Sequence, residues 1–139
     1  MAVIGPGDEP IVAAAEVGRL LAERGAVLVC GGLGGVMEGA CRGAKEAGGL
    51  TVGILPGGDR ADANPFVDVV LPTGLGEARN ALLVEAADVA IAIGRGYGTL
   101  SEVALALKAG KRVIGLDTWE IEGVTAAEGP EAAVAAALS

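Results

Sequence analysis

The sequence predicts an α/β fold: a single domain, residues 1–139, with a doubly wound, mostly parallel sheet and helices on both of its faces. Two observations lead to this prediction. Short β-rich segments alternate with helical patterns along nearly the whole chain. Most of these segments are apolar throughout, without the polar alternation of a half-exposed strand, and this is typical of a parallel sheet that is buried on both faces. The length of 139 residues suits one domain.

The apolar segments give the expected strands in chain order: 2–5, 26–30, 50–55, 67–71, 88–93 and 112–116. The helical patterns give the expected helices: 9–24, 35–47, 76–87, 99–109 and 130–138. The first helix ends at Gly25, because glycine readily adopts the left-handed conformation that terminates a helix. Residues 56–65 are polar and rich in turn formers, so they form a candidate lid. Residues 117–129 show little periodicity and are expected to be irregular surface.

The composition excludes several kinds of chemistry. The chain contains no histidine, so a Ser-His-Asp triad and an imidazole metal ligand are ruled out, and we expect no metal site. The net charge of −8 and the lack of a basic stripe argue against nucleic acid and anionic membranes as partners. Cys30 and Cys41 are expected to be reduced and structural. No long apolar segment or secretory leader is apparent, so a cytoplasmic protein is expected.

Glycine-rich turns follow three of the expected strands, at residues 5–7, 31–35 and 94–98, and each precedes a helix. Glycine lets backbone amides approach an anion, and the dipole of the following helix favours negative charge. Because the carboxyl ends of parallel strands meet at one edge of the sheet, the three turns together predict a phosphate or nucleotide site. The chain lacks the P-loop pattern, and the first turn lacks the third glycine of the dinucleotide fingerprint, so neither a P-loop NTPase nor NAD binding is expected. No cofactor is predicted.

Arg79 and Glu102 form the most suggestive charged pair, because each is expected near the start of a helix that follows a glycine-containing turn. A guanidinium and a carboxylate facing one ligand would suit the cleavage of a glycosidic bond without a metal or a histidine. Two other interpretations remain open. Thr99 and Glu102 also fit a capping box, in which both side chains bond only to backbone amides at the helix start. Arg79 also fits an ordinary surface cation.

Two stretches resemble motifs of the LOG family, whose members are also labelled lysine-decarboxylase-like. Residues 31–38 (GGLGGVME) resemble its GGxxGLM-type loop, and residues 94–102 (GRGYGTLSE) resemble its PGGxGTxxE signature. The resemblance covers nearly the whole chain and, together with residues 72–80 (PTGLGEARN), points most closely to a bacterial subgroup of the family.

The resemblance implies a Rossmann-like fold and a homo-oligomer, either a dimer or a tetramer. It also implies a metal-independent hydrolase that binds a nucleoside 5'-monophosphate and releases the free base and ribose 5-phosphate. The matching motif positions make Arg79 and Glu102 the catalytic residues. The ligand-binding positions are Gly31, Gly32, Gly34, Gly35, Met37, Arg95, Gly96, Tyr97, Gly98 and Thr99.

The sequence departs from the family pattern at three places. Asn80 stands where the family has lysine, Arg95 stands where it has glycine, and Glu38 replaces another glycine. The molybdenum cofactor carrier proteins resemble the same fold, and they would use the same loops to hold a pterin phosphate without turnover. The sequence therefore leaves three possibilities open: an N-glycosidase, a protein that carries or senses an intact ligand, and a protein that keeps the fold without a ligand.

Overall fold

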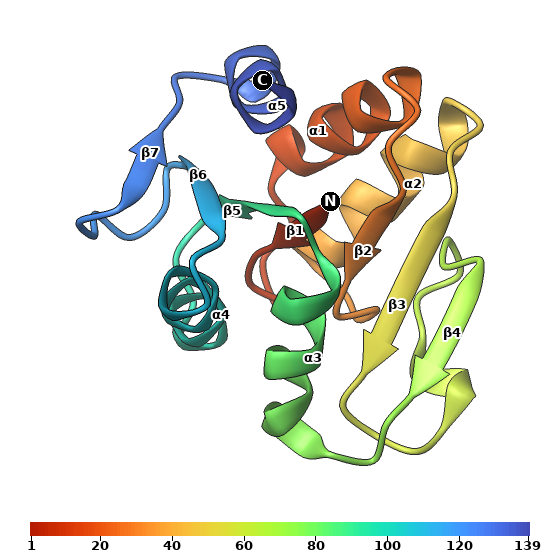
Figure 1. Cartoon of the computed structure of the whole chain (residues 1–139). Helices are drawn as coiled ribbons and strands as arrows, with labels where there is room; N and C mark the ends of the chain where they lie inside the picture. The colour runs from red at the N-terminus through yellow and green to blue at the C-terminus, as the bar shows by residue number, and fades with distance from the viewer.

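The computed structural model describes all residues, 1–139, and contains one seven-stranded sheet (Figure 1). All six strand pairings are parallel, and the strand order is β4-β3-β2-β1-β5-β6-β7. The strands are β1 Ala2–Ile4, β2 Leu28–Cys30, β3 Thr51–Leu55, β4 Val69–Pro72, β5 Val89–Ile93, β6 Arg112–Leu116 and β7 Val124–Ala126. The predicted α/β fold with a parallel sheet is thereby confirmed.

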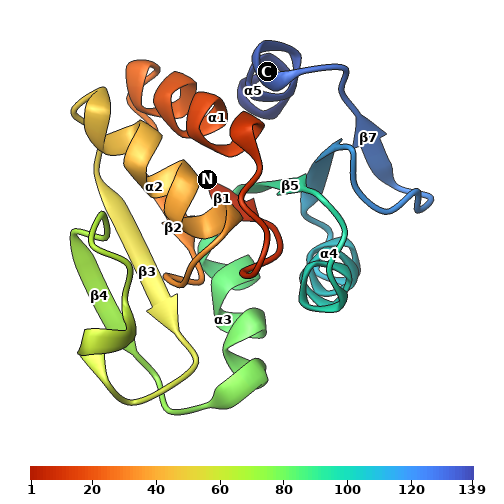
Figure 2. The same cartoon turned by 180° about the vertical axis from the view of Figure 1, so that it is seen from behind.

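Five helices cover the two faces of this sheet. They are α1 Val12–Glu23, α2 Val36–Glu46, α3 Arg79–Ala86, α4 Tyr97–Lys108 and α5 Pro130–Leu138, with short 3₁₀ turns η1 Arg60–Asp62 and η2 Gly76–Ala78. Helices α1, α2 and α5 pack on one face, and α3 and α4 pack on the other (Figures 1 and 2). No helix combines the length and the apolar character that crossing a membrane requires.

The core is built from small aliphatic side chains, and this lets the elements approach closely. Helices α1 and α2 pack backbone to backbone, because a Cβ atom on Gly18 would lie 2.0 Å from the Ala40 carbonyl oxygen. Gly43 meets the Ala15 carbonyl in the same way. The free thiols of Cys30 and Cys41 are buried in this layer, with their Sγ atoms 3.4 Å apart. A core of this kind depends on glycine and alanine at the helix contacts, because any added atom meets main chain.

The structure differs from the sequence-based expectations in the segment 117–129 and at three helix starts. Residues 117–129 are not wholly irregular, since β7 pairs with β6 at the edge of the sheet. This strand has only three residues, which is too short to produce a readable periodicity. Helix α1 begins at Val12 instead of residue 9, after Pro10, and α4 begins at Tyr97, two residues before the expected start. Helix α3 begins at Arg79 instead of residue 76, because residues 76–78 form the 3₁₀ turn η2. The loops before α1 and α3 are therefore longer than expected, and the loop before α4 is shorter.

The strand order places the change of direction between β1 and β5. From β1 the chain adds β2, β3 and β4 on one side, and then it returns to add β5, β6 and β7 on the other side. In open parallel sheets, the loops that leave two such neighbouring strands diverge to opposite faces and leave a crevice between them. The fold therefore directs attention to the loops after β1 and β5.

Candidate functional site

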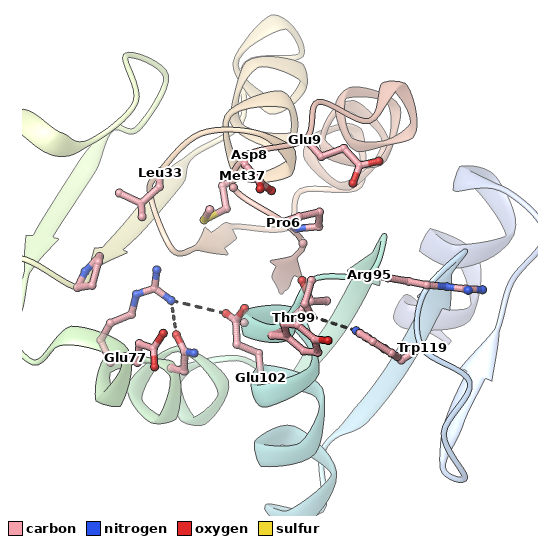
Figure 3. Close-up of a pocket in the computed structure, with 18 residues that line it drawn as sticks. Pro6, Asp8, Glu9, Leu33, Met37, Glu77, Arg95, Thr99, Glu102 and Trp119 are labelled. Carbon is pink, nitrogen blue, oxygen red and sulfur yellow. Dashed lines mark hydrogen bonds and ion pairs between the residues drawn. The ribbon is translucent and has the colours of Figure 1, made fainter.

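A pocket of about 690 Å³ lies at this change of direction (Figure 3). Its size is within the range of small-molecule sites. The loop after β1 forms one wall, and the loop after β5 with the first turns of α4 forms the opposite wall. The lining residues are Gly5, Pro6, Gly7, Asp8, Glu9, Leu33, Met37, Pro56, Glu77, Arg79, Asn80, Arg95, Gly96, Tyr97, Gly98, Thr99, Glu102 and Trp119.

The start of α4 presents free hydrogen-bond donors to this pocket. The backbone amides of residues 95–99 donate to no acceptor within the protein, and no side chain caps the helix. The hydroxyl of Thr99 is also without a partner, although Thr99 is only 1% exposed. A buried hydroxyl without a hydrogen-bond partner lowers the stability of the protein, unless a bound molecule supplies that partner. Together with the helix dipole, these donors suit the oxygens of a phosphate.

Arg79 and Glu102 lie deeper in the same pocket. Arg79 is the first residue of α3, Glu102 lies in α4, and their Nη1 and Oε2 atoms are 3.8 Å apart. Both side chains are 9% exposed. Burial raises the pKa of Glu102 to about 7, and the Arg79 charge opposes this shift only in part. A carboxyl group that titrates near neutral pH can accept or donate a proton under physiological conditions.

The structure decides against both alternative interpretations of this pair. The capping box does not form, because the helix begins two residues before Thr99 and the Thr99 hydroxyl makes no hydrogen bond. Arg79 is buried and is therefore not a surface cation. Its Nη1 donates to the Asn80 side-chain oxygen, while its Nε has no partner. Asn80, at the position of the family lysine, therefore helps to hold Arg79.

The glycines after β2 do not reach the pocket. A Cβ atom on Gly31 would lie 2.6 Å from Arg79 Nη2, and one on Gly35 would lie 2.3 Å from the Pro6 carbonyl oxygen. Gly32 and Gly34 pack closely as well, against Leu55 and Gly7. Of the predicted ligand-binding positions, the pocket wall therefore includes Met37, Arg95, Gly96, Tyr97, Gly98 and Thr99 but not Gly31, Gly32, Gly34 or Gly35.

Several lining residues were not among the predicted site residues. The glycine turn at residues 5–7 was a sequence signal for Pro6 and Gly7, and the carboxylates of Asp8 and Glu9 directly follow that turn. Figure 3 shows them across the pocket from Glu102. Trp119 comes from the segment expected to be irregular. It also lines the pocket, and its ring stacks on Tyr97 with ring centroids 6.0 Å apart.

Arg95 lies at the edge of the site. Its guanidinium is about half exposed and lies 3.7 Å from the fully exposed carboxylate of Asp117. An exposed pair of this kind contributes little to stability, so the side chain remains available for a ligand.

The fold and the pocket define the class: a Rossmann-like protein of the LOG type, with a glycine loop before α4 and an arginine–glutamate pair beside it. The chain belongs to the SLOG cluster4 family, whose model matches residues 1–138. The resemblance to LOG proteins that the motifs indicated is thereby confirmed.

Two of the similar proteins have different functions, and a third is uncharacterised. The chain is 37% identical over 95 residues to a probable cytokinin riboside 5'-monophosphate phosphoribohydrolase of Oryza sativa subsp. japonica, a match that covers 66% of this chain and 39% of that protein. It is 42% identical to the molybdenum cofactor binding protein from the phototrophic bacterium Rippkaea orientalis. That structure superposes with a TM-score of 0.91 over 97% of this chain and 92% of the other. An uncharacterised protein of Archaeoglobus fulgidus is 50% identical over 137 residues, which are 95% of this chain and 89% of that protein.

Proposed function

We propose that this protein binds a nucleoside 5'-monophosphate and hydrolyses its N-glycosidic bond, and that it does so as a homo-oligomer in the cytoplasm. The observation that carries the proposal is the buried pair of Glu102 and Arg79 beside the unpartnered hydroxyl of Thr99. The free amides of residues 95–99 would hold the phosphate, which places the ribose near the carboxyl group. The similarity to the rice phosphoribohydrolase supports the same reaction.

In this reaction a bond forms between the oxygen of water and C1' of the ribose, while the bond from C1' to the base nitrogen breaks. The bonding electron pair leaves with the base, which takes up a proton, and the products are the free base and ribose 5-phosphate. The Glu102 carboxylate accepts the proton of the attacking water and stabilises the positive charge that develops on the ribose. Arg79 orients the ligand and keeps part of the Glu102 population ionised near pH 7.

A second candidate function is the binding of an intact phosphate ligand, such as a pterin phosphate, without turnover. Two observations favour it. The molybdenum cofactor binding protein matches nearly the whole chain, whereas the rice hydrolase matches two thirds of it. Asn80 also replaces a lysine of the LOG pattern, which removes one cation from the site.

The deciding experiment is chromatographic detection of free base after incubation with AMP, GMP and an N6-substituted AMP. We expect base release by the wild-type protein, its loss in Glu102→Gln, and full activity in the control Glu85→Gln, whose side chain lies on the exposed face of α3. Calorimetry on the same samples measures binding. Binding without base release would overturn the hydrolase and favour the second candidate. The absence of both binding and base release would contradict a nucleotide site altogether.

A further inference from the structure

Two side chains after β6 hold the loop that precedes α4. The Thr118 hydroxyl donates to the Gly94 carbonyl oxygen at 2.6 Å. The Trp119 indole N–H donates to the Gly96 carbonyl oxygen at 3.0 Å, a bond drawn as a dashed line in Figure 3. Thr118 is buried, and Trp119 is partly buried. The segment 118–119 therefore contacts the backbone of the candidate phosphate loop, residues 94–98, at Gly94 and at Gly96.

These two bonds determine where the neighbouring amides point. In a trans peptide, the C=O and the following N–H lie in one plane and point in opposite directions. Fixing the Gly94 carbonyl therefore fixes the N–H of Arg95, and fixing the Gly96 carbonyl fixes the N–H of Tyr97. The Gly96 carbonyl also accepts the Leu100 amide at 2.9 Å, so it points along α4 and the Tyr97 N–H points out of the helix start. Both amides lack a protein acceptor, and both residues line the pocket.

Without the bond from Thr118, no hydrogen bond would fix the orientation of the Gly94 carbonyl. Gly94 has φ +79, and neither Gly94 nor Gly96 has a side chain that restricts its torsions, but the Leu100 amide also holds the Gly96 carbonyl. A rotated peptide would present its carbonyl oxygen instead of its N–H, and a carbonyl repels an anion. Donors that are already oriented bind an oxyanion without the free-energy cost of reorganising the loop.

We propose that Thr118 and Trp119 are positioning residues, which orient the amides of Arg95 and Tyr97 toward the phosphate of the bound ligand. The proposal rests on the phosphate site of the proposed function and extends it to two residues outside the family motifs. The two hydrogen bonds act on the phosphate loop alone, whereas the Trp119 ring also lines the pocket, so Thr118 gives the cleaner test.

The test compares the affinities for AMP and adenosine by calorimetry, since the ratio of the two dissociation constants isolates the contribution of the phosphate. Thr118→Val removes the hydroxyl at nearly constant volume, and we expect it to reduce that ratio about tenfold through weaker AMP binding, with adenosine affinity unchanged. Thr118→Ser keeps a hydroxyl and should restore the ratio. Trp119→Phe keeps a ring that can stack on Tyr97 but loses the N–H, and it should reduce the ratio less than Thr118→Val does, because the Leu100 amide still holds the Gly96 carbonyl.

The outcomes separate this proposal from the function on which it rests. Equal affinity of the wild-type protein for AMP and adenosine would overturn the phosphate site, and the positioning role with it. A wild-type preference for AMP that persists in Thr118→Val and Trp119→Phe would overturn the positioning role alone. So would an equal loss of AMP and adenosine binding in variants whose melting temperatures match the wild type, because that pattern indicates a general change in the pocket.

Discussion

The glycine loop after β2, residues 31–35, and the glycine loop after β5, residues 94–98, are alike in composition but have different surroundings. In the first loop, added Cβ atoms would collide with Arg79 and with the main chain of the β1 loop. In the second loop, a Cβ atom on Gly94 would lie 2.6 Å from Ile11, but one on Gly96 would have no neighbour closer than 3.3 Å, and one on Gly98 would have none within 4 Å. The glycines of the first loop are packed against protein, whereas Gly96 and Gly98 of the second line the pocket.

The comparison shows that a glycine-rich turn has two separate physical uses. After β2, glycine allows close packing and leaves room for the Arg79 guanidinium, and only Leu33 of this loop lines the pocket. After β5, glycine keeps a helix start accessible, so its amides can meet a ligand. Sequence composition does not separate the two uses, because the difference lies in what the neighbouring strands bring against each loop.

The largest expected effect is the loss of stability in Gly35→Ala. The Gly35 backbone has φ +60, and its new Cβ would lie 2.3 Å from the Pro6 carbonyl oxygen, an atom that cannot move without displacing the β1 loop. We expect the free energy of unfolding to fall by about 4 kcal/mol in denaturant titrations. Gly48→Ala is the control, because Gly48 has φ +76 but open space around the new Cβ. Equal losses in both variants would attribute the cost to backbone strain alone and not to packing of the first loop.

The second effect is a pH dependence that Glu102→Gln should remove. The pKa of Glu102 is about 7 in the folded protein and near 4.5 when unfolded, so between these values the folded state holds a proton that the unfolded state has released. The stability from this group is complete below pH 4.5 and is lost as pH rises through 7. The unfolding free energy of Glu102→Gln minus that of the wild type should therefore rise by up to about 3 kcal/mol from pH 4.5 to 8. Parallel pH profiles would contradict the raised pKa.

The first loop provides a way to sharpen this measurement. In Gly31→Ala the new Cβ would meet the flexible end of Arg79, so we expect the guanidinium to move and not the fold to fail. Because Arg79 lowers the pKa of Glu102, its displacement should move the pH at which the linked stability is lost above 7. An unchanged midpoint would show that the packing of the first loop does not control the charge of the site.

Much of this architecture could be predicted from the sequence, because buried parallel strands are uniformly apolar and helices end at glycine. The motifs also predicted that Arg79 and Glu102 face one cleft. The strand order itself could not be predicted, and the adjacency of β1 and β5 is what sets Asp8 and Glu9 across the pocket from Glu102. Trp119 was missed for a related reason, since its role follows from the pairing of β5 with β6 and not from any local pattern.

The smallest expected effect is a gain in stability, opposite in sign to the loss expected for Gly35→Ala. Gly98 is the second residue of α4, and its Cβ would enter open space, so Gly98→Ala should stabilise the helix by about 0.5–1 kcal/mol. The same methyl group would stand where a phosphate approaches the amides, so the affinity for AMP should fall while the melting temperature rises. Calorimetry and thermal denaturation of one sample measure both quantities. A variant that is stabilised but keeps its full AMP affinity would show that the anion does not approach the backbone at Gly98, and the contrast between the two loops would then rest on packing alone.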